Sequence, residues 1–327
     1  MDTIGNVPAE DGDLAFLSAM EAGIDPRAIA RAQEAAGQGR SVPKGSVEVI
    51  GFGEISCILR SEGSPGRIWK RLPLFRDHAE AERYAASFHE YSAALRVAGL
   101  ELPAQTTAII DRPGKMSVLY IGQEELRAVD FCHSRARSSE ATASLEVIDR
   151  VVREIMKIWE SNRRTGPALR LALDGQLSNW AIRTIDAVTG IVYVDTGTPL
   201  FRKDGIEQLE PEILLRSTPG FLRWILRLFF LKDVMERYYD LRSVLKDLAA
   251  NLYKEGRADL VEPSLAILNG SLPPGLAPFT VKEIDDYYRE DRLIWTLFLG
   301  FRRFDRFVKS RLLGLRYDFI LPGRIKR

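Results

Sequence analysis

Two short polar segments in the second half of the chain contain residue types that could handle a phosphate. The first runs from Asp174 to Asn179 with the sequence Asp-Gly-Gln-Leu-Ser-Asn, and the second is Asp195-Thr-Gly. A carboxylate, an amide five residues later and a second carboxylate could supply one base and two hard oxygen ligands for Mg²⁺. Each segment alone is also typical of a turn. Together they predict phosphoryl transfer from Mg-ATP.

The elements that would position these residues begin near Ser46, where short apolar strands alternate with turns. The pattern predicts the order β-β-β-α-β-β with short, antiparallel connections, and its helix covers residues 77–97. A glycine-rich turn, Gly51-Phe-Gly53-Glu-Ile-Ser56, joins the first two strands. Glycines let backbone N–H groups approach phosphates closely. Lys70 lies on the third strand, and its neighbour Arg71 should point to the opposite face.

The rest of the chain is predicted to be mainly helical. The Asp174 loop is followed by a hairpin of residues 180–185 and 191–194. We therefore expect an α+β protein with a helical extension over residues 1–45, a small sheet over 46–125 and a helical part over 126–327. The extension includes a helix that begins at Asp25-Pro26. Helices are predicted over residues 144–162, 221–238, 241–255, 281–289 and 291–313.

The order and spacing of these motifs over residues 46 to 200 resemble the protein-kinase-like superfamily, closest to its aminoglycoside and choline phosphotransferase branch. The resemblance implies a two-lobed fold that uses ATP and Mg²⁺. It implies that Asp174 is the base and that Asn179 and Asp195 bind the metal. Lys70 would contact the α- and β-phosphates. The glycine-rich loop, with Gly51, Gly53 and Ser56, would cover the nucleotide.

The resemblance also implies a helix glutamate that pairs with Lys70. Glu90 is the predicted partner, because the sequence from His89 to Pro103 is similar to the corresponding helix and turn of small-molecule kinases. Glu80 and Glu82 are the alternatives, although acids near a helix start can instead interact with the helix dipole.

Three departures separate the chain from ordinary protein kinases. Ala172 stands where the family usually has a histidine, so another residue, such as Trp180, must brace the loop. Gln176 replaces a lysine common in protein kinases, and no Ala-Pro-Glu-like segment follows Gly197. These differences favour a small-molecule acceptor with a hydroxyl or similar group. The alternatives are a pseudokinase-type nucleotide-binding or regulatory module and a kinase-like enzyme that transfers AMP.

The composition of the chain bears on its expected binding partners and cellular location. The 327 residues carry a formal net charge of +1, which gives no overall attraction to nucleic acid or acidic membranes. Two distant cysteines and three histidines make neither a disulfide framework nor a usual zinc site. With an acidic N-terminus unlike a signal peptide, these features predict a cytoplasmic protein. The apolar stretch 221–234 contains charges that favour a buried or amphipathic helix over a membrane span.

The last part of the sequence is basic and apolar at once. Residues 302–327 contain nine basic side chains, with phenylalanines and leucines between them: Arg302, Arg303, Arg306, Lys309, Arg311, Arg316, Arg324, Lys326 and Arg327. The pattern favours a helix packed on the helical part with a solvated basic face. Weak contact with a membrane surface is the alternative. We find no strong signal for nucleic-acid binding, and the oligomeric state is not predicted.

Overall fold

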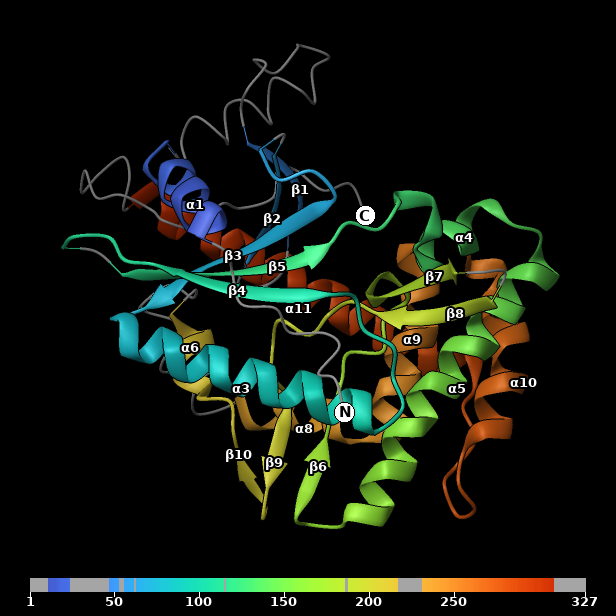
Figure 1. The fold of residues 1–327 in the computed structure, drawn as a ribbon. Coiled ribbons are helices and arrows are strands. Elements are labelled where there is room, and N and C mark those ends of the chain that lie inside the picture. The colour runs from blue at the N-terminus through green and yellow to red at the C-terminus, as the bar shows by residue number, and fades with distance from the viewer. Residues whose placement is uncertain are drawn as a thin grey trace.

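Five antiparallel strands in the order β1-β2-β3-β5-β4 form the main sheet of the protein in a computed structural model (Figure 1). The structure describes residues 11–23, 47–52, 56–61, 63–114, 116–185, 188–216 and 231–308. The predicted small antiparallel sheet is confirmed, and helices dominate the chain after it. The strands are β1 (Glu48–Phe52), β2 (Cys57–Arg60), β3 (Arg67–Phe75), β4 (Gln105–Ile110) and β5 (Ser117–Glu124).

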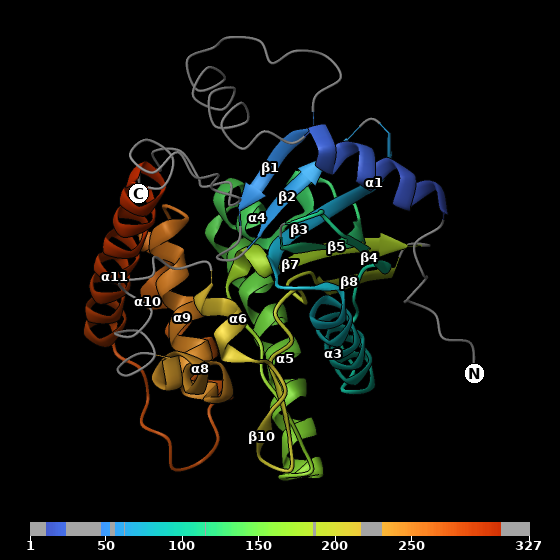
Figure 2. The same cartoon turned by 90° about the vertical axis from the view of Figure 1, so that its left-hand side faces the viewer.

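Two helices cover the two faces of this sheet, α1 (Asp11–Gly23) and α3 (His78–Val97) (Figures 1 and 2). Successive side chains of a strand point to opposite faces. Trp69 of β3 therefore packs with Leu17 of α1, whereas Leu72 joins the larger core that includes α3. The helix predicted to begin at Asp25 lies outside the described residues.

A fully buried ionic cluster fastens α1 to the sheet. Arg71 of β3 donates two hydrogen bonds of 2.7 Å to the Glu21 carboxylate, and neither side chain is more than 2% exposed. Tyr120 and Arg112 donate to the same carboxylate at 2.5 and 3.3 Å. Burial raises the pKa of Glu21, but these partners outweigh it and the pKa is lowered overall. The predicted separation of Arg71 from Lys70 is confirmed.

Helix α3 begins with a side-chain cap and buries the predicted stripe. The Asp77 carboxylate accepts a hydrogen bond of 2.8 Å from the backbone N–H of Glu80. The Glu80 carboxylate in turn accepts hydrogen bonds from Arg216 and from the backbone N–H of Arg76, both at 2.7 Å. The hydrogen bonds that Arg216 donates lower the pKa of Glu80 to about 2, although burial acts in the opposite sense. The buried stripe contains Tyr84, Phe88, Tyr91 and Leu95.

We expect Glu80→Gln to change how the protein responds to acid. Because the pKa of Glu80 is lower in the folded state, its charge stabilises the fold above the unfolded pKa of 4.5, and this contribution is lost as the pH falls toward about 2. The wild type should therefore lose more stability than Glu80→Gln between pH 5 and pH 3, by up to about 2 kcal/mol. Urea unfolding at several pH values would measure this. Equal pH dependence in both proteins would contradict the assignment.

Past the sheet, the chain forms a long helix and several small strands. The predicted helix 144–162 is α5, and the predicted hairpin is β7 with β8. A three-stranded sheet of β10, β9 and β6 was not predicted. The elements are η1 (Ala128–Asp130), α4 (Cys132–Ser138), α5 (Ala141–Thr165), β6 (Leu169–Leu171), η2 (Leu177–Asn179), β7 (Trp180–Ile185), β8 (Val188–Tyr193), β9 (Phe201–Lys203), β10 (Ile206–Glu207) and α6 (Pro211–Leu215).

The remaining helices form a layer beside α5, with α11 at its outer edge (Figure 2). They are α8 (Leu231–Tyr239), α9 (Leu241–Lys254), η3 (Ala258–Leu260), α10 (Val261–Ser271) and α11 (Val281–Phe307). The prediction of separate helices over 281–289 and 291–313 was wrong, because α11 continues through Glu290, where the sequence has neither Gly nor Pro. Residues 221–230 of the predicted helix 221–238 lie outside the described residues. None of the described helices has the length and hydropathy needed to cross a membrane.

Candidate active site

Lys70 and Asp195 meet where β3 approaches the segment that follows β8. The Lys70 Nζ donates to the backbone carbonyl of Val194 at 2.9 Å and lies 3.4 Å from Asp195 Oδ1. The Lys70 side chain is 8% exposed, whereas that of Asp195 is 37% exposed. The buried Lys70 ammonium is thus in contact with the partly accessible Asp195 carboxylate. Two residues that are 125 positions apart in the sequence are therefore in contact.

Three further side chains hold the Asp195-Thr196-Gly197 turn against the sheet and α3. The Nε2 groups of Gln105 and Gln123 donate to Thr196 Oγ1 at 2.7 and 3.2 Å. Tyr84 of α3 donates to the Gly197 carbonyl at 2.8 Å. The sequence reasoning missed all three. Polar glutamines in otherwise apolar strands were the available signal, because a buried amide needs a partner.

The predicted catalytic loop packs directly beside this turn. The Val194 N–H donates to the Asn179 carbonyl at 2.9 Å, which joins the loop to the residue before Asp195. Within the loop, the Asn179 amide donates to the Asp174 carbonyl at 3.3 Å, and Asp174 Oδ1 accepts from the Gln176 N–H at 3.0 Å. The Trp180 indole N–H donates to the Gly175 carbonyl at 3.3 Å. Trp180 therefore braces the loop, as the sequence suggested.

Two buried tyrosines support the backbone around Ala172, the position where kinase-like proteins usually have a histidine. Tyr91 of α3 donates to the Ala172 carbonyl at 2.6 Å, and the Tyr193 hydroxyl accepts from the Asp174 N–H at 3.3 Å. Burial raises the pKa of Tyr193 well above its usual value, and the nearby Asp195 and Asp174 charges raise it further. The hydroxyls therefore stay protonated, and they brace the loop without acting as bases.

Helix α9 holds the loop from the other side. Asn251 Oδ1 accepts from the Leu177 N–H at 3.2 Å, and its amide lies 3.5 Å from Gln176 Oε1. The Asp247 side chain is hydrogen-bonded to Gln176 and accepts from the Tyr287 hydroxyl at 3.2 Å. Burial raises the pKa of Asp247 despite these bonds. Gln176, at the position where protein kinases often have a lysine, is thus fixed by α9.

The two strands that flank the glycine-rich segment, β1 and β2, form as predicted. Gly51 is near the end of β1 and pairs with Ile58 of β2, beside an irregularity in the strand register. Ser56 is half-buried and directly precedes β2. Gly53 lies outside the described residues, so the turn's approach to a nucleotide stays a prediction.

The predicted pairing of Glu90 with Lys70 is wrong. Glu90 forms an ion pair with Lys203 of β9, and its side chain is 48% exposed. Glu90 and Tyr84 are six residues apart, which is about 240° around a helix, so Glu90 points away from the face that carries Tyr84. The alternatives do not pair with Lys70 either, because Glu80 binds Arg216 and Glu82 lies 3.4 Å from His78.

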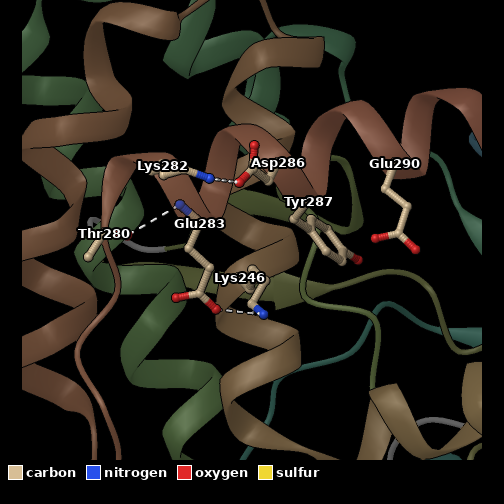
Figure 3. A pocket seen from close by; sticks show the side chains of 7 residues that line it. All are labelled: Lys246, Thr280, Lys282, Glu283, Asp286, Tyr287 and Glu290. Atoms are coloured by element: carbon tan, nitrogen blue, oxygen red, sulfur yellow. Dashed lines mark hydrogen bonds and ion pairs between the residues drawn. The ribbon is translucent and has the colours of Figure 1, made fainter.

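A shallow pocket lies between α9 and α11 (Figure 3). Four of its charged side chains pair with each other: Lys246 with Glu283 at 2.7 Å, and Lys282 with Asp286. Tyr287 extends from this pocket to Asp247 and so contacts the group that holds Gln176. The lining residues are Lys246, Thr280, Lys282, Glu283, Asp286, Tyr287 and Glu290.

The donor set at the site suits a phosphate-bound Mg²⁺ better than a metal held by protein alone. Within the described ranges, no group of three or more His, Cys, Asp or Glu side chains is placed to hold a metal ion. Asp195 and Asn179 offer one carboxylate and one amide. Mg²⁺ commonly binds one or two carboxylates and completes its octahedron with phosphate oxygens and water.

The sequence matches the model of a defined protein family. A family of unknown function, DUF6206, has a model that matches residues 33–306, and the chain belongs to that family. None of the curated proteins matches the sequence.

Two solved structures share a partial likeness with the chain. WaaP in complex with acyl carrier protein is 15% identical with a TM-score of 0.31, covering 79% of this chain and 98% of its own. An amicoumacin kinase in complex with AMP-PNP, Ca²⁺ and Ami is 10% identical with a TM-score of 0.31, covering 82% and 93%. At these values, neither likeness assigns an activity to this chain.

Proposed function

We propose that this protein is an ATP- and Mg²⁺-dependent phosphotransferase that acts on a hydroxyl or similar group of a small molecule. The observation that carries the proposal is the contact of the buried Lys70 with Asp195, beside the Asp174–Asn179 loop. The proposed fold is two-lobed and protein-kinase-like. The sheet up to about residue 125 would form one lobe, and the helical part would form the other.

The residues would divide the work by their chemistry. Bound Mg-ATP would supply the phosphoryl group. Lys70 would place its point charge on the phosphates, which suits an ammonium on a flexible stem. Asp195 and Asn179 would hold the metal. Asp174 would orient the acceptor hydroxyl and take its proton, which requires an ionised carboxylate.

The bracing contacts support this assignment because they limit movement at the reacting groups. Gln105, Gln123 and Tyr84 hold the Asp195 turn through backbone and Thr196 contacts, and so leave the Asp195 carboxylate to bind the metal. Tyr91 and Tyr193 hold the backbone before Asp174. Charge stabilisation in a transition state depends on groups that are already in place.

The proposal predicts that ATP with Mg²⁺ raises the melting temperature of the wild-type protein. A ligand that binds only the folded state at about 100 times its Kd adds about 2.7 kcal/mol of stability. Lys70→Met should lose most of this shift, because it removes the phosphate contact. Lys282→Met is the matched control, since Lys282 is 85% exposed on α11. A thermal-shift series with ATP, GTP and Mg²⁺ measures both.

Two outcomes would contradict the proposal: no shift with any nucleotide, or an unchanged shift in Lys70→Met. The departures at Ala172 and at the Lys70 partner are the reason to test the pseudokinase alternative. Such a module would bind nucleotide without consuming it. Product analysis separates the AMP-transferring alternative, which releases pyrophosphate and adds AMP to the acceptor, whereas a phosphotransferase releases ADP.

A further inference from the structure

The C-terminal half of α11, at the outer edge of the helical layer (Figure 2), carries an apolar stripe of exposed side chains. Its five large apolar side chains are between 38% and 60% exposed: Leu293, Ile294, Phe301, Phe304 and Phe307. At 3.6 residues per turn they fall within about 140° of the helix surface and extend for about 21 Å along it. Exposed apolar area gathered on one helix face marks an interaction surface.

Positive charge accompanies this stripe. From residue 292 to 316 the sequence contains one acid, Asp305, whose side chain is buried. Asp291, the acid just before, is paired with Lys254 at 3.2 Å. The seven basic residues of the same stretch of sequence are Arg292, Arg302, Arg303, Arg306, Lys309, Arg311 and Arg316. The last three lie outside the described residues. The stripe therefore lies in a strongly basic stretch of chain.

We infer that this face of α11 binds the surface of an anionic lipid bilayer. Large apolar side chains beside Lys and Arg are the combination by which a helix lies in the interface, with its apolar face among the acyl chains and its cations near anionic headgroups. The charge selects this occupant, since a second copy of the same basic face would be repelled. Nucleic acid would use the cations but leave the aliphatic Leu293 and Ile294 exposed.

Vesicle co-sedimentation tests the inference with the full-length protein. We expect the wild type to pellet with vesicles of equal parts phosphatidylglycerol and phosphatidylcholine, and much less with phosphatidylcholine alone. Added salt should weaken the binding. The double variant Leu293→Ser/Phe307→Ser should bind roughly tenfold more weakly or worse, because it removes two inserted side chains. Val97→Ser is the matched control, since Val97 of α3 is 86% exposed outside the stripe.

Several outcomes would overturn the inference. These are a wild type that stays in the supernatant with anionic vesicles, and a double variant that binds them as the wild type does. A wild-type dimer that becomes monomeric in the double variant, without vesicle binding, would assign the stripe to self-association. Binding to RNA but not to vesicles would assign the basic stretch to nucleic acid. Asp195→Asn should bind vesicles normally, so failure of the proposed phosphotransferase would leave this result intact.

Discussion

Replacing Asp195 with Asn is expected to lower Mg²⁺-dependent consumption of ATP by about 100- to 1,000-fold or more. The substitution keeps the size of the side chain but removes the charge that would hold the metal and that lies 3.4 Å from Lys70 Nζ. Asp174→Asn should cause a loss of about 100- to 10,000-fold, because it removes the proposed base. ADP formation with and without Mg²⁺ measures both effects.

The matched control is Asp204→Asn, in the exposed turn between β9 and β10. Asp204 has a φ of 48°, a left-handed conformation that Asn also adopts readily, so this variant should fold normally and keep full activity. If Asp195→Asn binds and consumes Mg-ATP as the wild type does, Asp195 is not the metal ligand. If Asp174→Asn alone remains fully active, the base lies elsewhere.

The substitution Glu21→Ala is expected to destabilise the protein by about 3–5 kcal/mol. It leaves the Arg71 guanidinium buried without the carboxylate that receives two of its hydrogen bonds. Tyr120 and Arg112 lose the same acceptor. Removing one partner of a buried ion pair lowers the free energy of unfolding by far more than the intact pair raises it, since the remaining charge cannot reach water. Urea or thermal unfolding measures the loss.

Two further variants test this reason. Glu48→Ala removes an exposed acid that pairs with Arg60 at 3.1 Å, and it should cost less than about 1 kcal/mol. Glu21→Ala combined with Arg71→Met should recover much of the lost stability, because the fully buried Arg71 charge is removed together with its partner. A single Glu21→Ala variant as stable as Glu48→Ala would mean that α1 does not depend on this cluster. Because Arg71 follows Lys70 on β3, we also expect weaker nucleotide binding in Glu21→Ala.

Local sequence patterns were sufficient to predict the helices and strands whose formation depends on nearby residues. The stripe of Tyr84, Phe88, Tyr91 and Leu95 predicted α3, because helical periodicity and an N-cap residue act within a few turns. The strand order around the glycine-rich turn was predictable for the same reason, as short connections join neighbouring antiparallel strands. The alternation of Lys70 and Arg71 followed from strand geometry alone.

Side-chain contacts between residues far apart in the sequence could not be predicted from local patterns. Glu90 matched a motif, but its position on α3 points it to Lys203. Gln105 and Gln123 could be noticed as polar residues in apolar strands, yet nothing local identifies Thr196 as their shared partner. The buried Glu21 of α1 contacts Arg71 and Tyr120 on strands of the sheet and Arg112 in the turn between β4 and β5, which are 50 to 99 positions away.

The sequence by itself determined the local elements and the identity of the polar groups at the Asp174–Asn179 and Asp195 segments. Periodicity, turns and caps act over a few residues and can be read in order. Only the tertiary structure decided that Lys70 reaches Asp195, that Tyr84 and two glutamines hold the turn between them, and that Glu90 has another partner. These contacts depend on how the sheet packs against α3 and the β7–β8 hairpin. Burial there selects partners that are far apart in the chain.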